Sequence, residues 1–138
     1  MQQQAHALAQ TLRAQHGAIS ARELAQRCQI EIVFARWEVA EGRLLYLAES
    51  TRRPPRITIN EAALESFAGL AQWEPQQLTE LVIAHELGHL LLPRPSIFAA
   101  ADQVEAAAHA FAQAWTQLDV HPLQIENLLR KELARRRA

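Results

Sequence analysis

Cysteine is nearly absent from this chain of 138 residues, which carries only Cys28. A single cysteine excludes an internal disulfide and favours a reducing compartment. The amino-terminal residues are polar and lack the basic start and apolar run of a secretory signal. No apolar run approaches the roughly 18 residues that a membrane-spanning helix requires. The sequence therefore predicts a cytoplasmic protein with no membrane partner.

Charge of one sign is also lacking. The chain has 14 basic and 15 acidic residues and a formal net charge of −1. This balance gives no general case for a nucleic-acid or membrane partner, so direct nucleic-acid binding is not expected. The basic residues between 130 and 137 most simply complement the dipole of a last helix, and a docking surface for an acidic partner is the alternative. The length suits one domain over residues 1–138.

Hydrophobic periodicity predicts a mixed amino-terminal region. Apolar residues at helical spacing predict a helix over about residues 5–16, and Ser20 with Glu23 predicts the capped start of a second helix. Alternating apolar residues then predict strands at residues 30–34, 44–47 and 57–60, with a turn at Glu41-Gly42 and a basic loop at residues 52–56. We expect these strands to form a small antiparallel sheet.

The remainder of the chain has helical patterns over residues 61–71, from 75 to about 92, and over residues 99–118, with a last helix after residue 119. Pro75 suits a first helical turn, and Pro93 with Pro95 ends the same helix. The predicted fold class is α+β: a small three-stranded antiparallel sheet packed with several helices.

The motif with the clearest chemistry is His85-Glu86-Leu87-Gly88-His89. On a helix, positions i and i+4 share a face, so the two histidines can bind one Zn²⁺ ion. Glu86 lies beside that face and can act as the general base of peptide hydrolysis. Gly88 has no side chain, so another element can approach there. These features predict a zincin-like active-site helix.

A catalytic zinc needs a third protein ligand and one open position. The metzincin pattern requires a glycine and a histidine where this chain has Leu92 and Pro95, so that class is excluded. Three downstream carboxylates remain before the predicted last helix: Asp102, Glu105 and Asp119. Glu105 is favoured, because a charge among alanines on a packed helix is costly unless it is paired or metal-bound.

His109 follows Glu105 by one helical turn and is a candidate for holding a ligand or steadying an oxyanion. A partly exposed helix histidine is the simpler alternative. Tyr46 and His121 are further oxyanion candidates, although each is individually more typical of ordinary core or surface positions.

With these elements placed, the chain resembles the ImmA/IrrE family of zinc metallopeptidases, a gluzincin-like group. Residues 84–92 are similar to the family's alanine, HELGH motif and following apolar residues. Residues 105–112 resemble its E-x-E-A-N-x-F-A helix, whose first glutamate is the third zinc ligand. The likeness covers roughly Leu24 to Trp115, and the two helical motifs are its specific parts.

The chain also departs from the family pattern. His109 replaces the usual Asn or Asp, and Ala107 replaces the second glutamate. The family's Leu-Leu-x-Pro after this helix is missing, and the segment between Asn60 and His85 adds a helix. No separate DNA-binding domain is present in the sequence.

The resemblance implies a metalloprotease that cleaves a helix-turn-helix transcriptional repressor at a specific site in a stress, phage or mobile-element response. A second hypothesis is a non-proteolytic binding module that retains the zinc site and sequesters a regulator, as a toxin–antitoxin partner does. A third is a zinc hydrolase of small amides. An open cleft favours a protein substrate, and a closed pocket favours a small one.

Overall fold

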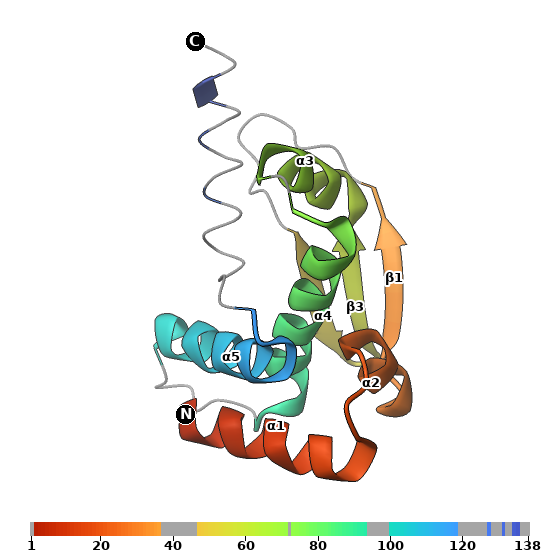
Figure 1. The fold of residues 1–138 in the computed structure, drawn as a ribbon, viewed down its shortest axis with the longest axis vertical. Helices are drawn as coiled ribbons and strands as arrows, with labels where there is room; N and C mark the ends of the chain where they lie inside the picture. The colour runs from red at the N-terminus through yellow and green to blue at the C-terminus, as the bar shows by residue number, and fades with distance from the viewer. Residues whose placement is uncertain are drawn as a thin grey trace.

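The computed structural model describes residues 2–36, 47–71, 73–93 and 100–118, together with positions 127, 131, 134 and 135. Figure 1 shows the arrangement of its elements. In chain order these are α1 (Gln2–His16), α2 (Ala21–Arg27), β1 (Glu31–Ala35), β2 (Ala48–Arg52), β3 (Pro55–Asn60), α3 (Glu61–Ala71), α4 (Pro75–Leu91) and α5 (Ala101–Thr116). The predicted α+β class and three-stranded sheet are confirmed. Tyr46, His121 and the predicted turn at residues 41–42 lie outside the described residues.

The sheet is mixed, so the prediction of an antiparallel sheet was wrong. Its order is β1-β3-β2, in which β1 runs parallel to β3 and β2 runs antiparallel to it. The alternation of apolar residues reports one buried face but not strand direction, because both kinds of pair share that period. The strand predicted at residues 57–60 is the central one. The two edges are β1 and β2.

The second strand also lies later in the chain than predicted. Residues 44–46 fall outside the described part, Leu47 precedes the strand, and the paired residues are Ala48 to Arg52. The expected basic loop at 52–56 is reduced to a tight turn at residues 53–54, which the Thr51 hydroxyl supports by donating to the Pro54 carbonyl at 2.8 Å. This strand lies at an edge of the sheet and carries mostly charged and hydroxyl side chains. It therefore lacks the alternating apolar residues from which a strand is predicted.

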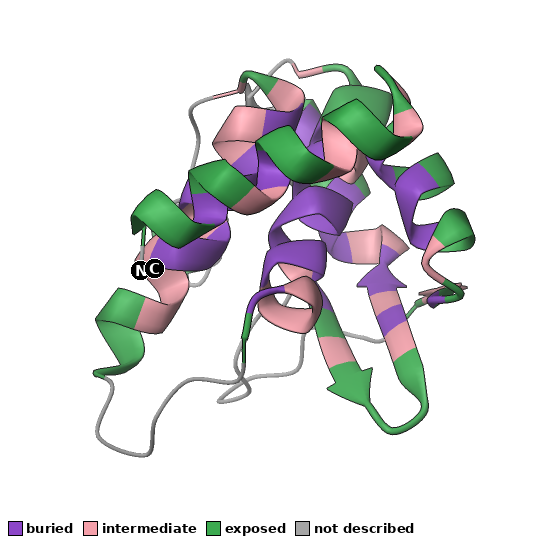
Figure 2. Cartoon of the chain, turned by 90° about the horizontal axis from the view of Figure 1, so that it is seen from below, coloured by how far each residue is buried: buried purple, intermediate pink, exposed green. Residues whose placement is uncertain are grey.

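Helix α4 occupies the centre of the fold. It packs against α2, α3, α5, β2 and β3, and Figure 2 shows its ribbon buried along most of its length. The buried positions of α4 are not confined to one apolar face. The buried residues of α4 are Leu78, Leu81, Val82, Ile83, Ala84, His85, Leu87 and Gly88. A helix surrounded in this way holds its polar side chains in fixed surroundings.

Helix α1 lies beside α5 (Figure 1). Ala5 and Ala9 are buried at this contact. The Arg13 guanidinium donates to the Trp115 carbonyl at 2.7 Å and lies 4.7 Å from the centre of the Trp115 ring. A hydrogen bond and a cation–π contact therefore fix α1 to the end of α5.

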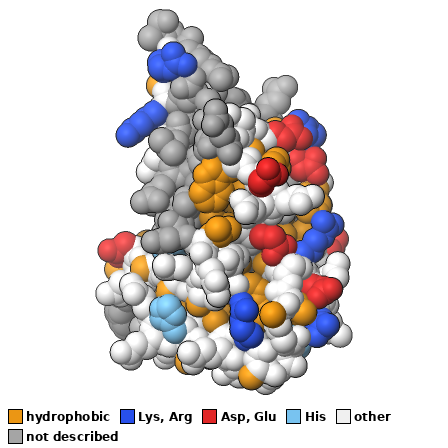
Figure 3. All heavy atoms as spheres, viewed as in Figure 1, with side chains coloured by type: hydrophobic (Ala, Val, Ile, Leu, Met, Phe, Trp, Pro, Cys, Tyr) orange, Lys and Arg blue, Asp and Glu red, His pale blue; other side chains and the backbone are white. Residues whose placement is uncertain are grey.

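The surface carries charges of both signs. Figure 3 shows acidic and basic side chains interleaved on the side formed by β1 and α3. Arg56 pairs with Glu31 at 3.1 Å across the parallel strands. Within the described residues, no helix combines the length and apolar character needed to cross a membrane.

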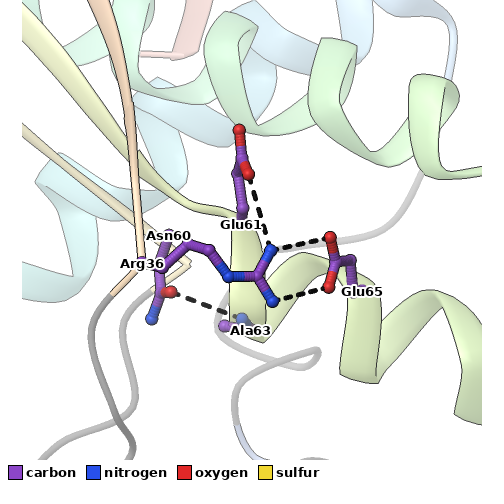
Figure 4. A network of polar contacts seen from close by, with 5 residues as sticks. All are labelled: Arg36, Asn60, Glu61, Ala63 and Glu65. Carbon is purple, nitrogen blue, oxygen red and sulfur yellow. Dashed lines mark hydrogen bonds and ion pairs between the residues drawn. The ribbon is translucent and has the colours of Figure 1, made fainter.

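The junction between the sheet and α3 is held by two polar contacts (Figure 4). The Arg36 guanidinium donates to both carboxylate oxygens of Glu65 at 2.9 Å and lies 3.5 Å from Glu61. The hydrogen bonds and opposite charge raise the pKa of Arg36 and lower the pKa of Glu65. Beside them, the fully buried Asn60 side chain accepts from the Ala63 backbone N–H at 3.4 Å. Asn60 thus caps α3 directly after β3.

We expect Asn60→Ala to lower the free energy of unfolding by about 2 kcal/mol, because it removes a cap and leaves a buried N–H without its acceptor. Ser20→Ala is the matched control. Ser20 caps α2 in the same way, accepting from the Glu23 N–H at 3.0 Å, but at an exposed position. Its loss should cost about 0.5 kcal/mol, since water replaces the acceptor. Urea unfolding measures both values, and equal losses would contradict a buried cap at Asn60.

Candidate metal centre

The two motif histidines lie on the last turns of α4. His85 is 3% exposed, and the side chain of His89 is 22% exposed. Their rings meet edge to face with centroids 4.9 Å apart, and their Nε2 atoms are 3.2 Å apart. Two imidazole nitrogens therefore point at one location, as the i, i+4 spacing predicts.

Glu105 reaches the same location from α5. Its Oε2 atom lies 3.0 Å from His85 Nε2, and its Oε1 atom lies 3.1 Å from His89 Nε2. Among the described residues, His85, His89 and Glu105 form the one group of His, Cys, Asp or Glu side chains arranged to hold a metal ion. Residues from two helices, 20 positions apart in sequence, thus form one cluster.

The spacing of these donors suits a small divalent ion. In a tetrahedral site with metal–ligand distances of about 2.0–2.2 Å, neighbouring donor atoms lie about 3.3–3.5 Å apart. The nitrogen–nitrogen and nitrogen–oxygen distances given above are 3.0–3.2 Å. Small side-chain adjustments would therefore admit an ion. His85, His89 and Glu105 can hold a metal ion.

Glu105 and His89 each stabilise the charged form of the other. Hydrogen bonds from His85 and His89 hold the pKa of Glu105 far below its ordinary value, although partial burial opposes this shift. Burial lowers the pKa of His89, but the hydrogen bond to Glu105 and the charges of Glu86 and Glu105 outweigh it and raise the pKa overall. Glu105 is therefore ionised over the physiological range, as a metal ligand must be.

Glu86 lies beside the cluster and not within it. It is partly exposed on α4, next to His85 in sequence. Its carboxylate is close enough to His89 for its charge to raise the pKa of that imidazole. The carboxylates of Glu86 and Glu105 thus both lie near His89, but Glu105 forms a hydrogen bond with this imidazole whereas Glu86 acts on it through its charge.

The crossing of α4 and α5 sets the distance between the histidines and Glu105 (Figure 1). A Cβ atom at Gly88 would lie 2.9 Å from the Cα atom and 3.0 Å from the carbonyl oxygen of Ala108. These are backbone atoms, so the clash could be relieved only by moving a helix. The expectation that another element approaches at Gly88 is confirmed.

Arg52 connects the sheet to the end of α4. Its guanidinium donates to the His89 carbonyl at 2.6 Å and more weakly to the Leu90 carbonyl at 3.4 Å. The last carbonyls of a helix lack partners within the helix, and a cation near them is favourable. The sequence predicts only a basic loop at residues 52–56 and does not indicate this role, because nothing in the local pattern points to a contact 37 residues away.

Asp102 and His109 lie near the cluster but outside it, and Asp119, the third carboxylate considered as a ligand, lies outside the described residues. Asp102 is exposed in the first turn of α5, where its carboxylate accepts from the Gln103 N–H at 3.0 Å. His109 is partly buried one turn after Glu105 and lines the same surface groove as that residue. Neither belongs to the three-residue group.

No family model, no curated protein and no solved structure matches this chain. What this site can bind must therefore be inferred from its residues and their geometry.

We expect Gly88→Ala to lower the free energy of unfolding of the metal-free protein by about 1–3 kcal/mol, because it forces two packed backbones apart. It should also weaken metal binding, since it moves Glu105 away from the histidines. Gly69→Ala is the matched control. Gly69 lies in α3 with no atom within 4 Å of an added Cβ, so alanine there should stabilise the protein by about 0.5–1 kcal/mol. Chemical unfolding and competition with a zinc chelator measure both effects. A stabilised Gly88→Ala protein would contradict the close crossing.

Arg52→Gln should weaken zinc binding by roughly two- to fivefold, because it removes the cation that holds the carbonyls of His89 and Leu90 at the end of α4. Arg53→Gln is its control, because it removes the same charge from the next residue, which is exposed. If charge repulsion between arginine and the metal dominated instead, both variants would bind zinc more tightly. A chelator competition titration distinguishes these outcomes.

Proposed function

We propose that this protein is a zinc-dependent endopeptidase. The observation that carries the proposal is the convergence of His85, His89 and Glu105 within hydrogen-bond distance of one another, with Glu86 directly beside them. Two imidazoles and one carboxylate with an adjacent second carboxylate are the donor set and the base of metal-dependent peptide hydrolysis.

The donor set supports zinc and a catalytic site. Imidazole nitrogens with one carboxylate oxygen suit zinc, whereas calcium and magnesium prefer oxygen ligands alone. Structural zinc sites are closed by four protein ligands, but the described group here has three members. The Glu105 side chain is 43% exposed and borders a surface groove. Water and substrate can therefore approach from that side.

Glu105 and Glu86 would have different roles, one as a metal ligand and the other as a base. A zinc ion bound there supplies Lewis acidity, which activates water and polarises a scissile carbonyl. Glu105, with its strongly lowered pKa, stays ionised and serves as a ligand. Glu86 lies beside the ligands without a hydrogen bond to them among the described contacts. Glu86 is therefore the group that accepts a proton from the attacking water and delivers one to the leaving amine.

A protein is the substrate class that we propose. The groove beside Glu105 is about 550 Å³ and is bordered by exposed residues at its end, such as Gln2 and Asp102. An open surface of this kind accommodates a polypeptide better than a small amide that needs enclosure. The resemblance of the two helical motifs to the ImmA/IrrE family supports a helix-turn-helix repressor as the natural substrate.

The test uses zinc-loaded protein and a library of peptides from a proteolytic digest of a bacterial proteome, with new chain ends read by mass spectrometry. The wild type should hold about one zinc per chain and cut a subset of peptides. Glu105→Ala should lose most of the zinc and the cleavage. Glu86→Gln should keep the zinc but cleave at least roughly a hundredfold more slowly, because it cannot accept the proton.

Glu74→Gln is the matched control for the loss of a carboxylate from α4. Glu74 precedes the helix at its other end, is exposed and makes no side-chain cap hydrogen bond. Its variant should cut as the wild type does. Undiminished cleavage by Glu86→Gln would rule out the proposed base. A wild type that holds zinc but cuts nothing would favour a non-proteolytic binding module.

A further inference from the structure

A surface groove runs along α5 beside α1. We call it the α1–α5 groove. Gln2 and His6 border it from α1, and one face of α5 between Ala101 and Gln113 forms the other wall. Its volume is about 550 Å³. The groove is hollow because alanines occupy several positions of its floor, where longer side chains would fill it.

We propose that this groove binds the polypeptide substrate on one side of the scissile bond and selects a lysine or arginine side chain through Asp102. This inference rests on the proposed endopeptidase function and specifies its substrate.

The position of the groove connects it to the chemistry. Glu105 belongs both to the groove wall and to the metal-binding group. A chain lying in the groove therefore passes Glu105, whose carboxylate contacts both His85 and His89. Asp102 lies one turn before Glu105, which corresponds to a rise of about 4.5 Å along the helix. That is the length of one to two residues of an extended peptide.

The length of the groove suits an extended peptide. From Asp102 to Gln113 the α5 face spans about 16 Å at 1.5 Å per residue. An extended chain advances about 3.3 Å per residue, so about five residues fit along it. A small amide would leave most of this surface uncovered.

The chemistry of the wall favours a basic side chain. Its floor exposes mostly apolar surface, which includes Ala101, Ala106 and Ala110. The two carboxylates among the described lining residues are Asp102 and Glu105, and no lysine or arginine lines the groove there. Glu105 is committed to the cluster, which leaves Asp102 as the exposed charge. Lysine and arginine combine an aliphatic stem, which can cover alanines, with a cation, which can meet Asp102.

The experiment compares Asp102→Asn with Gln103→Lys on the same proteome-derived peptide library, using zinc-loaded protein. Both substitutions change the net charge by one positive unit. Gln103 is exposed and adjacent, but it does not line the groove. The wild type should show roughly threefold enrichment of Lys and Arg at one position within three residues of the cut, as an exposed ion pair would supply. Asp102→Asn should lose the enrichment and keep its zinc, whereas Gln103→Lys should retain both.

A second variant tests the groove itself. Ala106→Leu places a larger side chain on the floor and should reduce cleavage of all peptides at least about fivefold at unchanged zinc content. Cleavage without a basic preference, or a preference that survives Asp102→Asn, would overturn the groove assignment and leave the endopeptidase intact. Absence of any cleavage by the zinc-loaded wild type would overturn both.

Discussion

The close crossing of α4 and α5 at Gly88 and Ala108 is the constraint on which the site depends. One helix supplies both histidines, and the other supplies the carboxylate. Neither helix alone forms a three-ligand group. Because α4 is surrounded by other elements and α5 is held from its far side by α1, the crossing has little freedom to open. This packing sets the distances between the side chains of His85, His89 and Glu105. Packed backbone atoms of the core thereby determine the geometry of the cluster.

The two glutamates near His89 have different surroundings. Glu105 meets two imidazoles, and these contacts stabilise its charged form. Glu86 influences His89 only through its charge. A carboxylate held by hydrogen bonds to two imidazoles keeps its negative charge, which suits the ligand role proposed for Glu105.

Most of the fold and the cluster could be predicted from local patterns, because the relevant signals lie within a few residues of one another. The histidine spacing, the cap at Ser20, the helix boundaries near residues 61–71 and the candidate Glu105 are of this kind. The parallel pairing of β1 with β3 could not, because it joins two strands that are not consecutive in the chain. The contact of Arg52 with the His89 carbonyl could not either, since it joins two elements that meet only after folding.

The three residues that could hold a metal ion lie on helices that are already packed together by an apolar core. A metal ion that binds there would displace protons from these side chains, but it would not be needed to fold the helices. His89, whose pKa is raised, must give up its proton to bind, so affinity for the ion falls as the medium becomes more acidic. The attraction between Glu105 and the two imidazoles holds these three side chains close together without an ion. Metal supply and acidity would then control the loading of a folded protein rather than its folding.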